Sequence, residues 1–268
     1  MHNNRRQEVG AFLFAAFVCL IRLIRCLFFF FSLFYFFSLQ LASHFSLKME
    51  KQAAFFCVDV ECGATSKRHS DRTPISVALS NQKEEVLFYS IIKPKEPIFS
   101  YLTPLTGVSE KDMINALPFE DVVHEIRKIL RGCDTLPLLV GNGIQNDITW
   151  LELVKGEDFS DCVDLAEMFK AWNPKYGQFN KYSLAHLCKQ LLGATIADTH
   201  CPKEDAVLSI RLYNRFKDDK SGLERAKNSM VGKIAPITFA KKNNYRYEGV
   251  CMAAYYPEKC ICDAPTKK

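Results

Sequence analysis

The sequence lacks both an internal repeat and the regular cysteine spacing of a secreted protein. Its eleven cysteines are scattered through 268 residues rather than paired at fixed short intervals, so we expect reduced thiols and not a disulfide framework. Cys251, Cys260 and Cys262 lie close together, but no fourth metal ligand stands near them in the sequence. Ordinary thiols are therefore favoured over a zinc site there.

Charge is missing from one long stretch near the N-terminus. Cys26 to Ser43 holds no charged residue, and seven of the ten residues from Phe28 to Phe37 are phenylalanine. A bilayer-spanning helix needs about 20 apolar residues, so this stretch is borderline. Residues 1–48 are interpreted as a hydrophobic N-terminal segment that is an anchor, a signal or a dispensable leader.

An inserted segment would place the rest of the chain across a membrane, in an oxidising space that suits its cysteines poorly. Nuclear or cytosolic localisation of a chain that starts at Met49 avoids this difficulty and is favoured. Membrane attachment through residues 11–43 is the alternative.

Positive charge is concentrated at the other end of the chain. From Lys220 to Lys268 there are ten Lys and Arg against four Asp and Glu, whereas the whole chain carries only +5, so the remainder sums to −1. This basic C-terminal extension, residues 219–268, suits a phosphate-bearing partner. A solvated terminal extension explains the charge equally well.

Residues 49–218 have the composition and patterning of one globular α/β domain. Hydrophobic β-rich runs alternate with segments whose apolar residues recur at helical spacing. Three strands followed by alternating helices and strands predict a mixed sheet covered by helices. The expected strands are 55–61, 75–79, 86–92, 136–140 and 162–165, and the expected helices are 119–130, 148–154, 183–192 and 202–216.

Acidic residues occupy the end of the first expected strand. Asp59 and Glu61 are two residues apart, so both point to the same face, with Phe55 and Cys57. Phe56, Val58 and Val60 should line the opposite face. Two adjacent carboxylates repel each other unless a cation separates them, and Mg²⁺ prefers such oxygen ligands. Taken alone, a solvated acidic pair is the commoner explanation.

Two later carboxylates are placed where helices begin. Asp147 follows a buried strand and a glycine turn, on the helical stripe expected to carry Trp150, Leu151 and Val154 into the core. Asp205 shares a helical face with Leu208 and Leu212, behind a helix start fixed by Pro202, and His200 lies in the loop before it. A buried carboxylate needs a partner, and a metal is the commonest strong one.

Taken together, these residues resemble the DEDDh 3′→5′ exonucleases, and within them the RNA exonuclease branch that includes the interferon-stimulated exonuclease. The resemblance runs from Phe55 to Phe216 in matching order and spacing. It is carried by Asp59-Val60-Glu61 and by four further segments: "LTGVSEKDM", "VGNGIQNDI", "SLAHLCKQLLG" and "THCPKEDAVLSIRLY". It departs from that branch at "ECGATSKRHS" and at Asn142 and Gln145, where histidines are common.

The resemblance implies a ribonuclease-H-like fold with a five-stranded mixed sheet, and a phosphodiester hydrolase. Asp59, Glu61, Asp147 and Asp205 would hold two Mg²⁺ (or Mn²⁺) ions, with Asp59 bridging them, and His200 would act as the general base. Gly107 and Asn146 are candidate substrate contacts.

The expected substrates are 3′ ends of RNA or single-stranded DNA, and no small-molecule cofactor is expected. A DNA-directed 3′ exonuclease and a catalytically silent nucleic-acid-binding module stay open as alternatives. The tyrosine-dependent DEDDy type is excluded by the lack of a tyrosine at the usual place near Asp205.

Overall fold

The computed structural model describes residues 54–263. The hydrophobic N-terminal segment, with the membrane alternative at residues 11–43, lies outside the described residues. Among the described residues, no helix has both the length and the apolar character needed to cross a membrane. The described residues belong to one compact unit, Ala53–Lys268.

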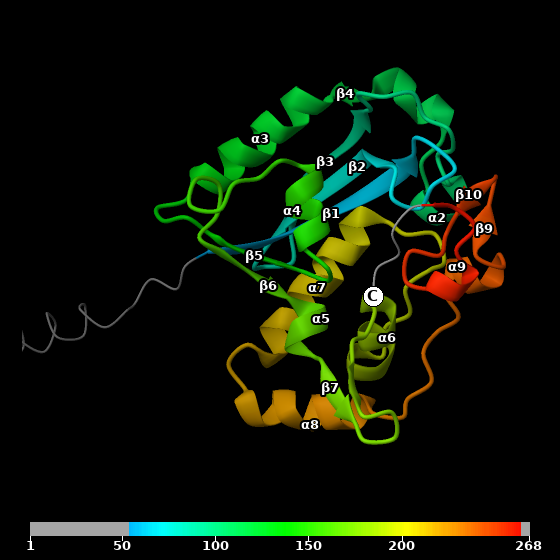
Figure 1. Cartoon of the computed structure of the whole chain (residues 1–268). Coiled ribbons are helices and arrows are strands. Elements are labelled where there is room, and N and C mark those ends of the chain that lie inside the picture. The colour runs from blue at the N-terminus through cyan, green and yellow to red at the C-terminus, as the bar shows by residue number, and fades with distance from the viewer. Residues whose placement is uncertain (1–53, 264–268) are drawn as a thin grey trace, which may run out of the picture. The chain divides into compact units, whose positions relative to one another are not determined.

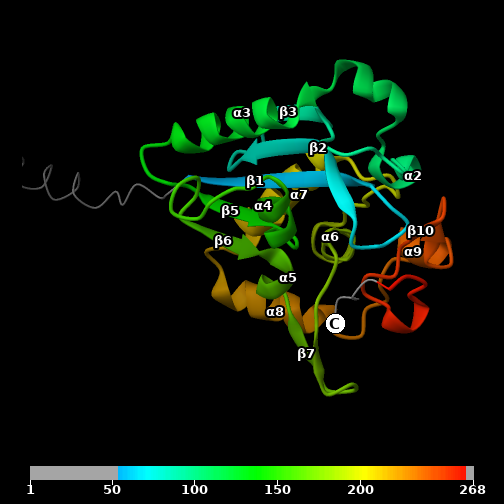
Figure 2. The same cartoon turned by 45° about the horizontal axis from the view of Figure 1, so that its top comes forward.

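A twisted six-stranded sheet organises this unit (Figures 1 and 2). Its strand order is β4-β3-β2-β1-β5-β6, so the first strand of the unit is central. β1 pairs antiparallel with β2 and parallel with β5, which makes the sheet mixed, as predicted. The strands are β1 (Phe55–Ala64), β2 (Arg72–Asn81), β3 (Val86–Lys93), β4 (Leu117–Pro118), β5 (Leu138–Gly141) and β6 (Asp161–Asp164).

The prediction of five strands was wrong by one. The sixth, β4, is only two residues long and pairs parallel with the end of β3 through Ile92 and Lys93. Two residues are too few to produce an alternating pattern, and Pro118 removes one donor, which suits an edge position.

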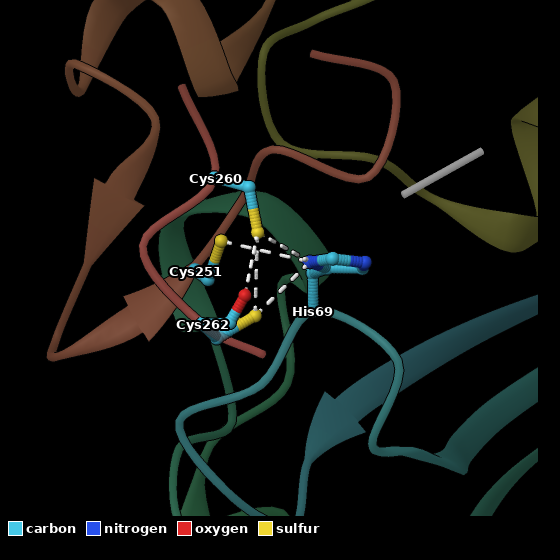
Figure 3. Close-up of side chains that lie close together, drawn as sticks. All are labelled: His69, Cys251, Cys260 and Cys262. Carbon is cyan, nitrogen blue, oxygen red and sulfur yellow. Dashed lines mark hydrogen bonds between the residues drawn. The ribbon is translucent and has the colours of Figure 1, made fainter. Parts of the chain in front are cut away.

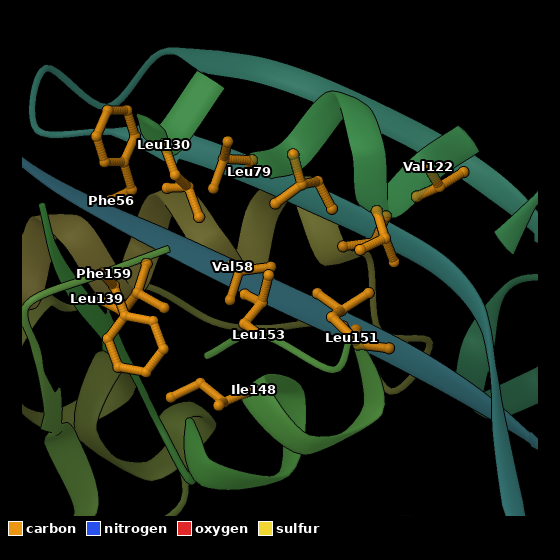
Figure 4. Close-up of a cluster of buried hydrophobic side chains, with 14 of the residues drawn as sticks. Phe56, Val58, Leu79, Val122, Leu130, Leu139, Ile148, Leu151, Leu153 and Phe159 are labelled. Atoms are coloured by element: carbon orange, nitrogen blue, oxygen red, sulfur yellow. The ribbon is translucent and has the colours of Figure 1, made fainter. Parts of the chain in front are cut away.

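The first hydrophobic core lies between one face of the sheet and α3 (Phe119–Arg131) (Figure 4). Phe56, Val58 and Val60 of β1 belong to it, as the alternation predicted. α3 presents its apolar stripe to the same core and ends next to Gly132. The buried members of that stripe are Phe119, Val122, Val123, Ile126 and Leu130.

The second core lies on the opposite face, where Phe55 and Cys57 of β1 point. α7 (Pro202–Phe216) crosses this face and buries Ala206, Ile210 and Leu212. Three shorter helices also cover this face: α5 (Leu165–Met168), α6 (Leu184–Leu187) and α8 (Lys220–Met230). A small antiparallel hairpin, formed by β7 (Ala171–Asn173) and β8 (Gln178–Asn180), lies between α5 and α6 in the chain.

The predicted ends of two helical segments, based on capping and helix-breaking residues, are confirmed. The Ser183 hydroxyl accepts a hydrogen bond from the His186 amide (3.3 Å), and the helix, which continues from α6 as a π-helical segment (Cys188–Leu192), ends at Gly193 with φ 68°. Only a glycine adopts that left-handed turn without strain. α7 starts at Pro202 and ends at Phe216, as predicted.

The helix predicted over 148–154 is shorter and begins earlier. α4 spans Gln145–Trp150, and Val154 is exposed rather than buried. The cause lies downstream, where the buried Asp158 carboxylate accepts a hydrogen bond from the Val154 amide (2.8 Å) and pairs with Arg127 and Arg131 of α3. Because the Val154 amide is bonded to Asp158 in this turn, it does not continue the hydrogen bonding of α4.

The basic C-terminal extension contains ordered elements. α8 buries Ala226 and Met230 in the second core. Beyond it come α9 (Phe239–Lys242), the two-residue strands β9 (Arg246–Tyr247) and β10 (Val250–Cys251), and a short 3-10 turn, Pro257–Lys259. The Cys251 amide donates to the Lys67 carbonyl (2.8 Å), so this part lies against the loop between β1 and β2.

Candidate active site

The acidic pair belongs to β1, the strand whose two faces are covered by the first and the second hydrophobic core. Glu61 is buried and Asp59 is half-buried. β1 carries both because the alternation that sends Val58 and Val60 into the first core turns Asp59 and Glu61 toward the face of α7. The register with β2 is continuous past Asp59 and shifts between Glu61 and Cys62, so an irregularity of the β-bulge type follows the pair directly, before pairing resumes as far as Ala64.

Asp147 is held against this strand by the backbone. Its Oδ1 accepts a hydrogen bond from the amide of Val60 (2.9 Å), the residue between the two β1 carboxylates. The turn that delivers Asp147 requires Gly143, whose φ is +77°. The predicted position in the first turn of a helix is confirmed for α4.

His200 and Asp205 complete the cluster from the start of α7. The His200 Nδ1 lies 3.6 Å from the Glu61 Oε1 and 3.5 Å from the Asp205 Oδ2. Asp205 is buried and its side chain is only 5% exposed, whereas that of His200 is 44% exposed. The three residues can offer ligand atoms that all lie within 4.8 Å of one another. The imidazole therefore stands between the carboxylates and solvent.

The segment around Gly107 fixes the His200 loop. The His200 amide donates to the carbonyl of Leu105 (2.7 Å), next to the short helix α2 (Thr103–Thr106). Gly107 has φ +71°, and a Cβ there would lie 3.3 Å from the Thr199 methyl group and 3.5 Å from the His200 carbonyl. Gly107, predicted as a substrate contact, thus lies directly behind the histidine loop.

The electrostatics of the cluster disfavour its fully ionised, metal-free state. Burial, and then the charge of Asp147, raise the pKa of Asp59 well above its usual range. Burial likewise raises the pKa of Asp147 and raises that of Asp205 to about 6. The pKa of His200 is raised chiefly by its hydrogen bond with Glu61.

A divalent cation fits this donor set. The Oδ1 of Asp205 is buried and has no hydrogen-bond partner within the described part of the chain, and an orphaned carboxylate oxygen calls for one. Carboxylate oxygens are the ligands that Mg²⁺ and Mn²⁺ prefer. Within the described part of the chain, His200 is the basic side chain that pairs with these carboxylates, through Glu61 and Asp205, so a divalent ion would offset charge that no lysine or arginine there offsets.

Sequence reasoning missed Asp164 at the end of β6. Its Oδ1 accepts from the Gly143 amide (2.9 Å) and from the Ala166 amide (2.8 Å), where it caps α5. It therefore ties the turn before Asp147 to the neighbouring strand. Its position at the carboxyl end of a parallel strand was the available signal. Asn146, the other predicted substrate contact, is half-buried beside Asp147.

A family model described as exonuclease (RNase_T) matches residues 56–213. This range includes all four carboxylates and His200, and it covers more than half of the chain. The chain belongs to this exonuclease family.

Its relatives carry the same name in several organisms. The exonuclease domain is similar to RNA exonuclease 4 of Gibberella zeae (36% identity, 49% of this chain and 39% of that protein). It is also similar to RNA exonuclease 4 of Kluyveromyces lactis (28% identity, 69% of this chain and 59% of that protein). The match thus spans between about two fifths and three fifths of those relatives.

Solved structures bear out the fold. The catalytic unit of Neurospora crassa Pan2, with protease and nuclease domains, superposes with a TM-score of 0.54 at 19% identity, over 68% of this chain and 30% of that one. The exonuclease module of Saccharomyces cerevisiae Pan2 in complex with AAUUAA RNA gives the same TM-score at 18% identity, over 66% and 31% of the two chains. This agrees with the ribonuclease-H-like expectation.

Proposed function

We propose that this protein is a DEDDh 3′→5′ exonuclease that hydrolyses RNA and releases 5′-mononucleotides. The observation that carries the proposal is the meeting of Glu61, His200 and Asp205, within 4.8 Å, from segments nearly 140 residues apart. The hydrogen bond from Val60 to Asp147 brings a further carboxylate to the same strand. Buried acids with raised pKa values that converge on one histidine are typical of functional sites.

Asp59, Glu61, Asp147 and Asp205 are the residues that would hold two Mg²⁺ (or Mn²⁺) ions. When bound there, the ions would neutralise charge on the phosphodiester and on the attacking and leaving oxygens. The four carboxylates would fix the positions of the ions, because strand pairing and burial restrict the conformations of their side chains. Asp164 acts one step behind them as a positioning residue for the Asp147 turn.

His200 would remove the proton from the attacking water. Its side chain is the most exposed of the three that meet at the start of α7, so it can reach solvent while Glu61 and Asp205 cannot. Its raised pKa comes first from Glu61. A histidine works as a base only when neutral, so Glu61 must be engaged elsewhere, as a metal ligand would be.

RNA is the substrate that the relatives favour. The curated relatives are named RNA exonuclease 4, and the yeast Pan2 module was solved with bound RNA. Gly107 and Asn146 lie beside His200 and Asp147, respectively, and are proposed to approach the substrate backbone.

The proposal is tested by incubating the purified full chain with 5′-labelled RNA and with DNA of the same sequence, in Mg²⁺ or EDTA. We expect Mg²⁺-dependent shortening of RNA from its 3′ end. His200→Ala should lower the rate by about 10²- to 10⁴-fold. His124→Ala, on the exposed face of α3, is the matched control and should leave the rate unchanged.

Other outcomes separate the alternatives. A 3′-phosphate on the RNA should block the first cleavage, and a circular RNA should stay intact, whereas cuts in the circle would reveal an endonuclease. Faster loss of DNA than of RNA would indicate a DNA-directed enzyme. Tight binding of RNA without hydrolysis in Mg²⁺ or Mn²⁺ would indicate a silent binding module.

A further inference from the structure

Four metal-binding side chains meet at a second place, where the loop after β1 contacts the C-terminal extension (Figure 3). They are His69, Cys251, Cys260 and Cys262, and their ligand atoms all lie within 4.8 Å of one another. We propose that these residues bind one structural Zn²⁺ ion. This site is separate from the carboxylate cluster and does not depend on the proposed nuclease activity.

The distances match a tetrahedral zinc centre. Zinc with ordinary bond lengths holds two sulfurs about 3.8 Å apart and a sulfur and a nitrogen about 3.5 Å apart. The Sγ atoms of Cys260 and Cys262 are 3.6 Å apart. The His69 Nδ1 lies 3.6 Å from the Sγ of Cys251, 3.7 Å from that of Cys260 and 3.2 Å from that of Cys262.

A disulfide explains the cluster less well. Bonded sulfurs lie about 2.05 Å apart, whereas the Sγ atoms of Cys260 and Cys262 are 3.6 Å apart, and none of the three cysteines forms a disulfide with another described residue. A disulfide would also leave the third thiol and the imidazole unexplained, although all four side chains point toward one centre (Figure 3). Three cysteines and one histidine form one of the closed ligand sets of structural zinc, with no open position for a substrate.

The charge and burial of the surroundings suit such a centre. His69 and Cys251 are buried, which a permanent structural ion requires. Three thiolates and Zn²⁺ sum to one negative charge, and the guanidinium of Arg72 lies 3.3 Å from the Cys251 carbonyl. Arg72 is therefore placed to offset the charge.

The segment from α9 onward also needs a cross-link of this kind. Among the described residues, the hydrophobic cluster that the segment from α9 onward joins has only three buried members, Ala64, Leu102 and Val250, and two of these belong to other parts of the chain. Small units with so little core usually depend on metals or disulfides. Zinc at this place would fasten the segment from α9 onward to the β1–β2 loop.

The ion would support the rim of the active site through this segment. Lys242 of α9 pairs with Asp198, two residues before His200. Cys251 is backbone-bonded to Lys67, in the loop that leads away from Glu61. The zinc cluster thus connects both the strand that carries Glu61 and the loop that carries His200.

The experiment is elemental analysis of the full chain after expression with zinc and gel filtration. We expect about one zinc per chain. The double variant Cys260→Ser/Cys262→Ser should lose it and unfold at a lower temperature. Cys133→Ser/Cys162→Ser, which removes two half-buried thiols elsewhere, should keep it. Asp59→Asn should also keep it, which separates this site from the carboxylates.

A second measurement does not depend on the folding of variants. Titrating the wild-type chain with a mercurial should release the zinc, and Co²⁺ put in its place should show thiolate-to-cobalt charge transfer and tetrahedral d–d bands. Wild-type protein with no more zinc than the double-serine variant would overturn the proposal. So would a Cys260–Cys262 disulfide found by peptide mass spectrometry of protein prepared without oxidant.

Discussion

At the scale of single residues, the carboxylates of the active site are costly to the metal-free fold. Asp59, Asp147 and Asp205 all have raised pKa values, chiefly because they are buried. A raised carboxyl pKa means that the folded chain disfavours the ionised form, which the proposed metal binding would require. Stability and function therefore oppose each other at these positions.

Asp59→Asn should show this opposition. Losing one ligand removes several kcal/mol of transition-state stabilisation, so we expect the rate to fall by at least about 10²-fold. Without metal the variant should unfold at the same or a higher temperature than the wild type, because a buried negative charge is gone. Asp121→Asn, on the exposed face of α3, is the control for both measurements. Substantial Mg²⁺-dependent activity in Asp59→Asn would contradict the assignment.

The stability of the metal-free protein should fall as pH rises through the weakly acidic range. Asp205 has a folded pKa of about 6 against an ordinary 3.8, so the folded chain binds more protons than the unfolded chain in that window. Stability is then lost as pH rises from about 4 to 6. His200 contributes with the same sign at higher pH, because its pKa is also raised.

Thermal unfolding in EDTA at several pH values from about 4 to 8 measures this slope. Asp205→Asn should flatten it, and Mg²⁺ should raise the unfolding temperature most at the high-pH end, where the ligands are ionised. A wild-type unfolding temperature that rises steadily with pH in EDTA would refute the electrostatic argument.

At the scale of elements, the loop between α2 and β4 determines where the histidine lies. Gly107 adopts φ +71° directly behind the His200 loop. Gly107→Ala should cost about 1 kcal/mol of stability from backbone strain and should also displace His200, so the rate should fall further than stability explains. Gly177 has a similar φ, +62°, but a Cβ added there would meet no atom of the described residues within 4 Å. Gly177→Ala should therefore lower stability without lowering the rate. Equal rates for the two variants would refute the positioning role.

Asp158 joins α3 to the turn after α4. Its buried carboxylate pairs with Arg127 and with Arg131, whose Nη2 lies 2.6 Å from the Asp158 Oδ1. Asp158→Ala leaves the Val154 amide without its acceptor and removes both arginine pairs, so it should destabilise the domain by about 1–3 kcal/mol in chemical denaturation. Asp161→Ala, which removes an exposed pair with Lys155, should change stability little. Similar effects of the two variants would contradict the importance given to Asp158.

Helix ends marked by a proline or glycine in the local sequence were predictable, whereas ends that depend on distant contacts were not. Pro202 and Gly193 mark helix ends by their own backbone chemistry, and the alternation in β1 assigned both faces correctly. The end of α4 depends on Asp158 and two arginines of another helix. The acidic residues followed from spacing and resemblance, whereas His69 is 182 residues from Cys251, so no local pattern could join them.

At the scale of the whole molecule, the basic extension is part of the packing. α8 contributes Ala226 and Met230 to the second core, beside α7. A chain that ends at Asp218, the predicted limit of the exonuclease domain, would expose that core. We expect it to unfold at a lower temperature than a chain that ends at Gly232, which keeps α8. Equal unfolding temperatures for the two truncations would show that α8 adds no stability.

The central place of β1 also has a consequence for synthesis on the ribosome. Each of the five strands after β1 pairs with one that was translated earlier: β2 with β1, β3 with β2, β4 with β3, β5 with β1 and β6 with β5. The sheet can therefore grow outward as the nascent chain emerges. His200 and Asp205 come only afterwards, so the cluster with Glu61 can be completed only after every strand of the sheet has been synthesised.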